Sequence, residues 1–293
     1  AIARAQRISA QECPSIGAYT NSNGLATVRE AVARFIGQRD GYPADADAIY
    51  LTNGASEGIA RVLNAIVSGP NVGVLIPIPQ YPLYTATLAM LNATPVPYYL
   101  DEEAAWELSP AALRRTIRAA RTEQGVDVRA LVVINPGNPT GSVLSRECLR
   151  EIVRVCREER LVLLADEVYQ ENIYDAHSRP FVSAKRVVCE LGLQEDVELF
   201  SFHSTSKGLL GECGRRGGYY ECSGIDPAVM AQLFKVASVS LCSNVLGQLM
   251  VGLMVDPPAP QDASFARYQR EKQDVLSNTL LRPRPAQLSL CCM

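Results

Sequence analysis

The chain has 293 residues, of which 47% are hydrophobic and 20% are charged, a composition typical of a globular protein with a sizeable core. Its net charge of −3 argues against nucleic acid or an anionic membrane surface as the main partner, and no apolar run reaches the roughly 18 residues that span a bilayer. Nine cysteines without regular paired spacing are typical of reduced thiols, and two histidines offer little material for a metal site, so we expect no metal.

The first predicted helix covers residues 25–37, where apolar residues recur on one face and a glycine ends the pattern. The polar turn before it, residues 16–24, carries one aromatic side chain, Tyr19. Further along, short β-rich runs alternate with amphipathic stretches. The strands are expected at 48–52, 72–76, 95–99, 130–134, 161–165 and 197–202. The helices are expected at 59–67, 84–91, 110–121, 146–159, 187–191, 227–246 and 265–281.

This alternation predicts an α/β fold, with a mostly parallel or mixed sheet sandwiched by helices. In such sheets ligands bind beyond the carboxyl ends of the strands. Chemically suggestive residues follow five of the predicted strands, so we expect them to meet at one edge of the sheet.

Four of these strand ends carry the following motifs. Strand 48–52 leads into N-G-A-S-E-G, whose small Ala55 and Ser56 open a helix and let an anion approach its N-terminus. Strand 72–76 is followed by P-I-P-Q-Y-P, which presents Tyr81. Strand 130–134 runs into N-P-G-N-P-T-G, a rigid turn that fixes the amide of Asn138. Strand 161–165 ends in D-E-V-Y, which contains Asp166 and Tyr169.

The fifth strand end, S-F-H-S-T-S-K-G, places Lys207 in a serine- and glycine-rich loop. Such a lysine is usually a solvated turn residue. The chain has only four lysines, Lys185, Lys207, Lys235 and Lys272, and its other basic side chains are arginines. A lysine in this loop is therefore more consistent with a role for its amine. A partly desolvated amine forms an imine with a carbonyl, and the hydroxyls of Ser204 and Ser206 with one guanidinium suit a phosphate. Pyridoxal 5'-phosphate (PLP) requires both features.

Two other readings have less support. Asp166 and Glu167 resemble the metal-binding acidic residues of a P-loop nucleotide site, but no G-x-x-x-x-G-K-[ST] loop accompanies them. A dinucleotide fold is unsupported because no G-x-G-x-x-G follows the first strand.

Taken together, the motifs resemble those of the fold-type I PLP-dependent aminotransferases, and within that family the alanine aminotransferases (glutamate–pyruvate transaminases) most. The resemblance covers about residues 1–281 and rests on L-T-N-G-A-S-E-G-I, I-P-I-P-Q-Y-P-L-Y, V-V-I-N-P-G-N-P-T-G, A-D-E-V-Y-Q-E-N-I-Y and F-H-S-T-S-K-G-L-L-G-E-C-G-R-R-G-G-Y-Y-E. N-P-G-N-P-T-G and S-x-S-K mark the superfamily, and G-E-C-G-x-R-G-G-Y points to the alanine enzymes.

The resemblance implies a role for each site residue. Lys207 would hold PLP as an imine and act as the catalytic base, with Asp166 at the pyridine nitrogen. Tyr169 and Asn138 would hydrogen-bond the phenolic oxygen, and Tyr81 would stack on the ring. The phosphate would be bound by Ala55, Ser56, Ser204 and Arg216. Arg216 fits better than Arg215 because the family's arginine directly precedes Gly-Gly-Tyr.

The resemblance also implies a homodimer, because Tyr19 matches a tyrosine that such enzymes lend to the phosphate of a neighbouring subunit. We expect three segments. Residues 1–40 would hold this crossing loop and a helix, residues 41–260 the PLP-binding large domain, and residues 261–293 a truncated linker helix with an atypical tail. The helix predicted at 227–246 is expected near the dimer contact.

The family's small domain is expected to be largely missing. Its substrate-carboxylate arginine belongs to a C-terminal segment, but here Pro283 and Pro285 follow the helix at 265–281, and neither Arg282 nor Arg284 is a credible substitute. We therefore expect a large domain that is truncated at both ends.

By resemblance the reaction is L-alanine with 2-oxoglutarate, giving pyruvate and L-glutamate. The alternatives are a PLP-binding but catalytically inactive truncated isoform, or an aminotransferase with another amino donor, glyoxylate-linked or aromatic. The expected location is cytoplasmic, or mitochondrial if a targeting segment has been lost.

Overall fold

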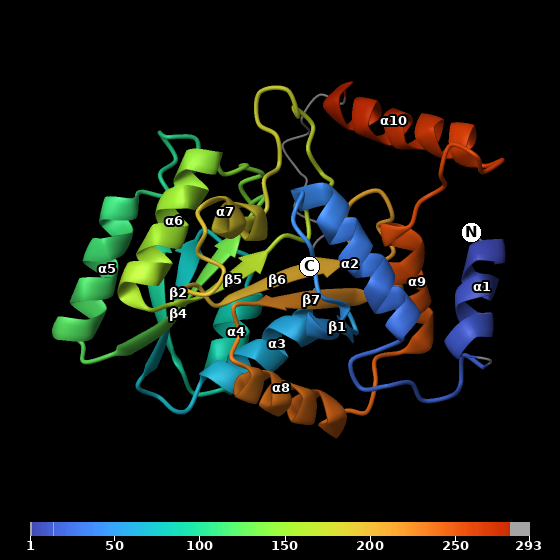
Figure 1. The fold of residues 1–293 in the computed structure, drawn as a ribbon. Coiled ribbons are helices and arrows are strands. Elements are labelled where there is room, and N and C mark those ends of the chain that lie inside the picture. Colours follow the sequence, from blue (N-terminus) through green and yellow to red (C-terminus); the bar gives the residue numbers. More distant parts are fainter. Residues whose placement is uncertain (1, 14, 282–293) are drawn as a thin grey trace.

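The computed structural model describes residues 2–13 and 15–281 and is built around one seven-stranded sheet (Figure 1). The strand order is β1-β7-β6-β5-β4-β2-β3. The strands are β1 Ile49–Thr52, β2 Val72–Ile78, β3 Thr94–Tyr99, β4 Asp127–Ile134, β5 Val162–Asp166, β6 Leu199–Ser204 and β7 Gly218–Ser223. The predicted mixed α/β sheet is confirmed, with six strands close to their expected positions.

Strand β7 was not predicted, and it decides how the sheet edge is built. It pairs antiparallel with both β1 and β6, whereas the other neighbouring strands run parallel. Consequently β1 points the same way as β6, and β7 begins at the edge where the other strands end. Gly218 reads as loop in the sequence because glycine weakens a strand signal. A Cβ on Gly218 would lie 2.7 Å from the backbone carbon of Gly54, so the close crossing of β7 and the β1 end requires glycine.

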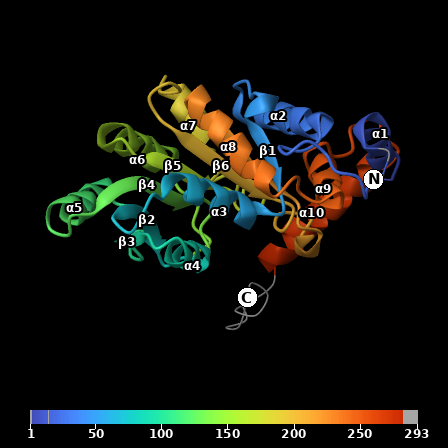
Figure 2. The same cartoon turned by 90° about the horizontal axis from the view of Figure 1, so that it is seen from below.

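Helices cover both faces of the sheet (Figures 1 and 2). The α-helices are α1 Ile2–Glu12, α2 Ala26–Asp40, α3 Ala55–Ile66, α4 Leu83–Met90, α5 Pro110–Thr122, α6 Arg146–Glu159, α7 Ala184–Glu190, α8 Pro227–Val239, α9 Val245–Val255 and α10 Phe265–Leu281. One buried cluster packs α5, α6 and α7 on one face, and a second packs α3, α4 and α8 on the other. A third joins α2 and α9 to β1. Across the described residues no helix is long and apolar enough to cross a membrane.

The single helix predicted over 227–246 is wrong, because the chain forms two helices there. Helix α8 ends at Val239, and Leu241 adopts the left-handed backbone conformation (φ 61°) that breaks the helical path. Helix α9 then begins after Asn244, whose side chain accepts a hydrogen bond of 2.6 Å from Gly247 N. Helix α10 begins at the predicted residue, Phe265, and Leu281 is the last described residue. Arg282, Arg284 and the rest of the expected tail lie outside the described residues.

Candidate functional site

A cavity of about 290 Å³ lies at the strand ends and gathers nine of the ten predicted site residues. Those nine are Ala55, Ser56, Tyr81, Asn138, Asp166, Tyr169, Ser204, Lys207 and Arg216. Ser206 and Cys213 also line it, and Ile59, Leu83, Ile134 and Val168 supply apolar walls. The tenth residue, Tyr19, is absent from the lining, and its side chain is 80% exposed. The edge predicted from the strand–loop pattern therefore forms one concave site.

One end of the cavity is suited to an anion. Helix α3 begins there with Ala55 and Ser56, so its first backbone N–H groups face the cavity rather than a helical partner. Arg216 is held close by, since its Nη2 donates to Asn53 O at 2.9 Å. Asn244 Nδ2 supports the same corner by donating to Arg216 O at 3.1 Å and to Asn53 Oδ1 at 2.8 Å.

Glycine at position 54 makes this corner possible. Gly54 has φ 81°, and a Cβ there would lie 2.5 Å from Arg216 Nη2. Only glycine combines that backbone angle with room for the guanidinium. Ser204, which also lines the cavity, has its Oγ 3.1 Å from Gly217 O and 2.9 Å from Ser206 Oγ, so the two hydroxyls are hydrogen-bonded to each other and to the backbone. Hydroxyls, one guanidinium and a helix N-terminus are groups that suit an anion such as a phosphate.

The buried floor of the cavity carries Asp166 at the end of β5. Tyr84, a fully buried residue of α4, donates to Asp166 Oδ2 at 2.8 Å, and Val168 N donates weakly to Oδ1 at 3.4 Å. Burial raises the pKa of Asp166 to about 6, although the Tyr84 hydrogen bond and the nearby Lys207 charge both favour the ionised form. A cationic ring nitrogen placed beside this carboxylate would favour ionisation further.

Lys207 and a polar pair form the middle of the cavity. Lys207 is half-buried, and its Nζ lies 5.1 Å from the ring centroid of Tyr169. Asn138 Nδ2 donates to the Tyr169 hydroxyl at 3.2 Å, so the amide and the phenol are held together. Tyr81 is 42% exposed and lines the cavity from the loop after β2. The amine therefore lies in the same cavity as both the carboxylate and the anion site.

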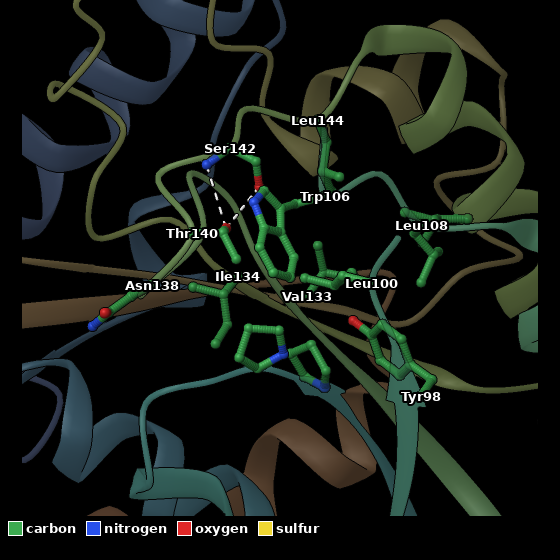
Figure 3. A pocket seen from close by; sticks show the side chains of 14 residues that line it. Tyr98, Leu100, Trp106, Leu108, Val133, Ile134, Asn138, Thr140, Ser142 and Leu144 are labelled. Atoms are coloured by element: carbon green, nitrogen blue, oxygen red, sulfur yellow. Dashed lines mark hydrogen bonds between the residues drawn. The ribbon is translucent and has the colours of Figure 1, made fainter. Parts of the chain in front are cut away.

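A second, much smaller cavity of about 20 Å³ lies next to Asn138, and Asn138 is part of its lining (Figure 3). The two cavities share Ile134 and Asn138, and Figure 3 shows the Asn138 amide pointing away from the ring of Trp106. Thr140 Oγ1 and Ser142 Oγ, 2.8 Å apart, brace the same loop. This side cavity has room for about one water, and its lining residues pack against the loop that presents Asn138.

Sequence reasoning missed two features of this site. Tyr84 reads as one more apolar position of helix 84–91, because nothing in a single sequence says that its hydroxyl meets Asp166. The clamp of Asn53 and Asn244 on Arg216 joins residues almost two hundred positions apart, so only the folded chain brings them together. The glycine preceding Ala55 was the one available signal for a close backbone approach.

The sequence is similar to a known family and to named relatives. The sequence model of the family described as aminotransferase class I and II matches residues 1–278. Human alanine aminotransferase 1 is 54% identical over 282 residues, covering 94% of this chain and 56% of the relative. Glutamate–glyoxylate aminotransferase 1 of Arabidopsis thaliana is 50% identical over 286 residues, covering 97% and 59%. The chain thus spans somewhat more than half the length of these two relatives.

Solved structures give the same fold. An aminotransferase from Escherichia coli matches with a TM-score of 0.76 and 28% identity, over 88% of this chain and 60% of that one. An alanine aminotransferase from Pyrococcus furiosus matches with a TM-score of 0.77 over 94% and 64%, and at 22% identity it supports the fold alone.

Proposed function

Because the chain belongs to the aminotransferase class I and II family, we propose that it carries the cofactor site of a transaminase that converts L-alanine and 2-oxoglutarate to pyruvate and L-glutamate. The family's cofactor is PLP, which draws electrons from the substrate α-carbon when bound as an imine. The observation that carries the proposal is one cavity containing an amine, Lys207, a buried carboxylate, Asp166, and an anion site at the start of α3.

The residues present fit this cofactor. PLP has an aldehyde, a ring nitrogen and a phosphate, and the cavity offers a separate partner for each. The α3 N-terminus, Ser204 and Arg216 suit the phosphate, and Asp166 suits the ring nitrogen. Apolar side chains of Ile59, Leu83, Ile134 and Val168 line the remaining wall, as expected for a ring-sized ligand.

Each polar residue then has a defined task. The Lys207 amine would hold the cofactor through its aldehyde and, once displaced by the incoming amino acid, would take the proton from the substrate α-carbon and give it to the cofactor rather than back to that carbon. Asp166 would keep the ring nitrogen protonated. Tyr169 and Asn138 would hydrogen-bond the ring oxygen, and Tyr81 would pack against the ring face.

A second substrate pair has specific support. The Arabidopsis relatives named glutamate–glyoxylate aminotransferases 1 and 2 are 50% and 49% identical to this chain, against 54% for the human alanine enzyme. Glyoxylate is therefore the competing amino acceptor. A PLP-binding chain without turnover is the other alternative, because this chain spans only part of its relatives.

The test measures binding and turnover on the same polypeptide. We expect PLP addition to produce an imine absorption band that is lost in Lys207→Ala, followed by alanine-dependent formation of pyruvate with 2-oxoglutarate. A band without pyruvate from any acceptor selects the non-catalytic alternative, and a preference for glyoxylate selects the second substrate pair. A wild-type chain without the band contradicts the proposal as a whole.

A second copy of the chain is the proposed partner. Exposed large apolar side chains occur on α8 (Val229, Phe234 and Val239), in the segment that joins it to α9 (Leu241) and in the first turn of α9 (Leu246). The Tyr19 segment lies beside them, since Thr20 N donates to Cys242 Sγ at 3.4 Å. This face supports a homodimer in which Tyr19 reaches the partner's phosphate site. Light scattering of the wild type and Leu241→Glu tests it, with a dimer expected only for the wild type.

The proposed compartment is the cytoplasm, with mitochondria as the alternative. The cysteines that the structure describes as free include four buried thiols, Cys13, Cys148, Cys156 and Cys222, which is typical of a reducing compartment. Some relatives carry mitochondrial names, such as the probable alanine aminotransferase of Dictyostelium discoideum. Fractionation of cells expressing the natural gene distinguishes the two.

A further inference from the structure

A buried ionic cluster lies behind the candidate site, on the other side of the sheet. Asp166 lines the cavity, whereas its neighbour Glu167 turns away toward α2 and α7, as expected for successive residues at a strand end. Glu167 is 2% exposed, and its Oε1 accepts a hydrogen bond of 2.7 Å from Ala184 N at the start of α7. The segment 166–170, which carries both Asp166 and Tyr169, is thus attached to α2 and α7, and neither helix lines the cavity.

Arg39, in the last turn of α2, is the centre of this cluster. Its guanidinium contacts both carboxylate oxygens of Asp40, at 2.8 and 2.6 Å. Its Nη1 donates to Gln170 Oε1 at 2.7 Å and lies 3.8 Å from Glu167 Oε2. The side chain is 16% exposed, and the rings of Phe35 and Phe181 lie 6.0 and 5.8 Å from its central carbon. One cation therefore reaches both ends of the 167–170 turn.

The other partners of the cluster hold Arg39 in place. Asp40 Oδ1 accepts from Ser183 Oγ at 2.8 Å, and Ser183 in turn accepts from Arg186 N at 3.0 Å as the N-cap of α7. Gln170 Nε2 donates back to Glu167 O at 3.1 Å, which closes the turn on itself. The geometry needs a planar fork with several donors, which arginine has and lysine lacks.

We propose that Arg39 is a positioning residue of the candidate cofactor site, which fixes the turn bearing Asp166 and Tyr169 from the side of the sheet opposite the cavity. The proposal rests on the proposed function for the identity of the ligand. Arg39 touches neither substrate nor cofactor. Its effect is to keep the Asp166 carboxylate and the Tyr169 hydroxyl at the spacing that the ring requires, which lowers the cost of ordering them on binding.

The alternative is that substitution of Arg39 affects stability alone, because removing one partner of a buried ion pair leaves an uncompensated charge. The chain offers a matched control on the same helix. Arg29 is 7% exposed, and its Nη1 pairs with Asp47 Oδ1 at 2.9 Å and donates to Ala46 O at 2.5 Å. Arg29 contacts no part of the 167–170 turn. Replacement of either arginine by lysine therefore removes contacts of a buried guanidinium, but only Arg39 supports the site. The match is in the arginine alone, because the Asp47 side chain is 87% exposed.

The experiment compares Arg39→Lys, the milder Gln170→Ala and the control Arg29→Lys with the wild type. Amide hydrogen exchange is followed in the ligand-free chain at residues 167–172, and the dissociation constant of PLP is measured from its imine absorption. We expect Arg39→Lys to accelerate exchange in this segment and to raise the dissociation constant, each by about tenfold. Gln170→Ala should also accelerate the exchange and raise the dissociation constant. Arg29→Lys should lower the unfolding temperature and leave the exchange and the dissociation constant unchanged.

The results distinguish failure of the positioning role from failure of the proposed function. Unchanged exchange at 167–172 in Arg39→Lys overturns the proposal, and so does faster exchange with an unchanged dissociation constant. If Arg39→Lys does not fold, Gln170→Ala decides by the same two readouts. If the wild type itself forms no imine band, the proposed function fails, while unchanged exchange in the ligand-free variants would separately reject a positioning role for Arg39.

Discussion

The Tyr84 hydroxyl donates a hydrogen bond of 2.8 Å to Asp166 Oδ2 in the fully buried floor of the cavity. Burial and the neighbouring Asp166 charge raise the pKa of Tyr84, so its hydroxyl stays protonated and acts as a donor. A donor to a buried carboxylate favours the ionised form of Asp166, which a protonated ring nitrogen needs. Tyr84 is therefore a residue of α4 that acts on the cofactor site through Asp166.

Tyr84→Phe should raise the pKa of Asp166 above its value of about 6, because the donor that favours the carboxylate is lost. We expect PLP binding near neutral pH to weaken by about 1–3 kcal/mol, the range for a hydrogen bond to a charged group. The difference from wild type should disappear below about pH 5, where the carboxyl is protonated in both. Titration of the PLP dissociation constant against pH measures this.

Tyr98→Phe is the control for that change. Tyr98 is also buried, and its hydroxyl donates to Val132 O at 2.8 Å rather than to a cavity residue. It should lose stability without any change in PLP affinity. Equal effects of the two substitutions on affinity would contradict the role assigned to Tyr84.

Glu167→Gln should change how stability depends on pH. Burial raises the pKa of Glu167 to about 7 from an ordinary 4.5. Since the folded state holds the proton more tightly, the stabilisation is complete below about pH 4.5 and is lost as the pH rises through about 7. We expect the free energy of unfolding of the wild type, relative to Glu167→Gln, to fall by up to about 3 kcal/mol over this window.

Urea unfolding of both ligand-free chains at several pH values measures this difference. The paired comparison cancels the opposing contribution of His203, whose pKa burial lowers to about 3. A relative stability that rises with pH instead would mean that attraction to Arg39 outweighs burial of the Glu167 carboxylate.

Gly54→Ala should damage the anion site as well as the fold. Alanine at φ 81° and ψ 165°, a backbone region almost exclusive to glycine, costs about 1–3 kcal/mol of stability, and its Cβ would displace the Arg216 guanidinium 2.5 Å away. We expect the affinity for PLP to fall about tenfold or more, because a hydrogen bond to a charged phosphate is weakened. Competition between PLP and inorganic phosphate should show the same loss for both ligands.

Gly41→Ala supplies a control at a second glycine of positive φ. Gly41 ends α2 at φ 78° and ψ 11°, in the left-handed helical region, and a Cβ there would meet nothing within 4 Å. Its substitution should lower stability and leave both affinities unchanged. If Gly54→Ala behaved in the same way, Arg216 would not depend on this close approach.

Tyr169→Phe should separate the ring-oxygen contact from cofactor binding as a whole. The hydroxyl accepts from Asn138 Nδ2 at 3.2 Å, so its removal takes away one of the paired donors expected at the ring oxygen. We expect the pKa of the cofactor imine, followed by its absorption band, to rise while the cofactor remains bound. An unchanged spectroscopic titration would contradict the placement of the ring oxygen beside this pair.

Much of the fold follows from local pattern. Helix α6 has the predicted bounds because its start and stop are set by nearby residues, for example by Ser145, whose side chain caps α6. The buried parallel strands are equally visible as apolar runs. Strand β7 and the break between α8 and α9 were missed, since the first depends on pairing across the sheet and the second on a backbone turn at Leu241.

The sequence by itself determined which residues meet at one edge of the sheet, because Lys207, Asp166 and the small residues that open α3 follow strands whose carboxyl ends must share that edge. Only the tertiary structure decided what supports them. Tyr84 beneath Asp166, Asn244 behind Arg216, and Arg39 behind the 167–170 turn are joined by contacts between separate elements. Strand ends are fixed by chain direction, which local sequence encodes, whereas side-chain partners depend on how helices pack, which no local pattern specifies.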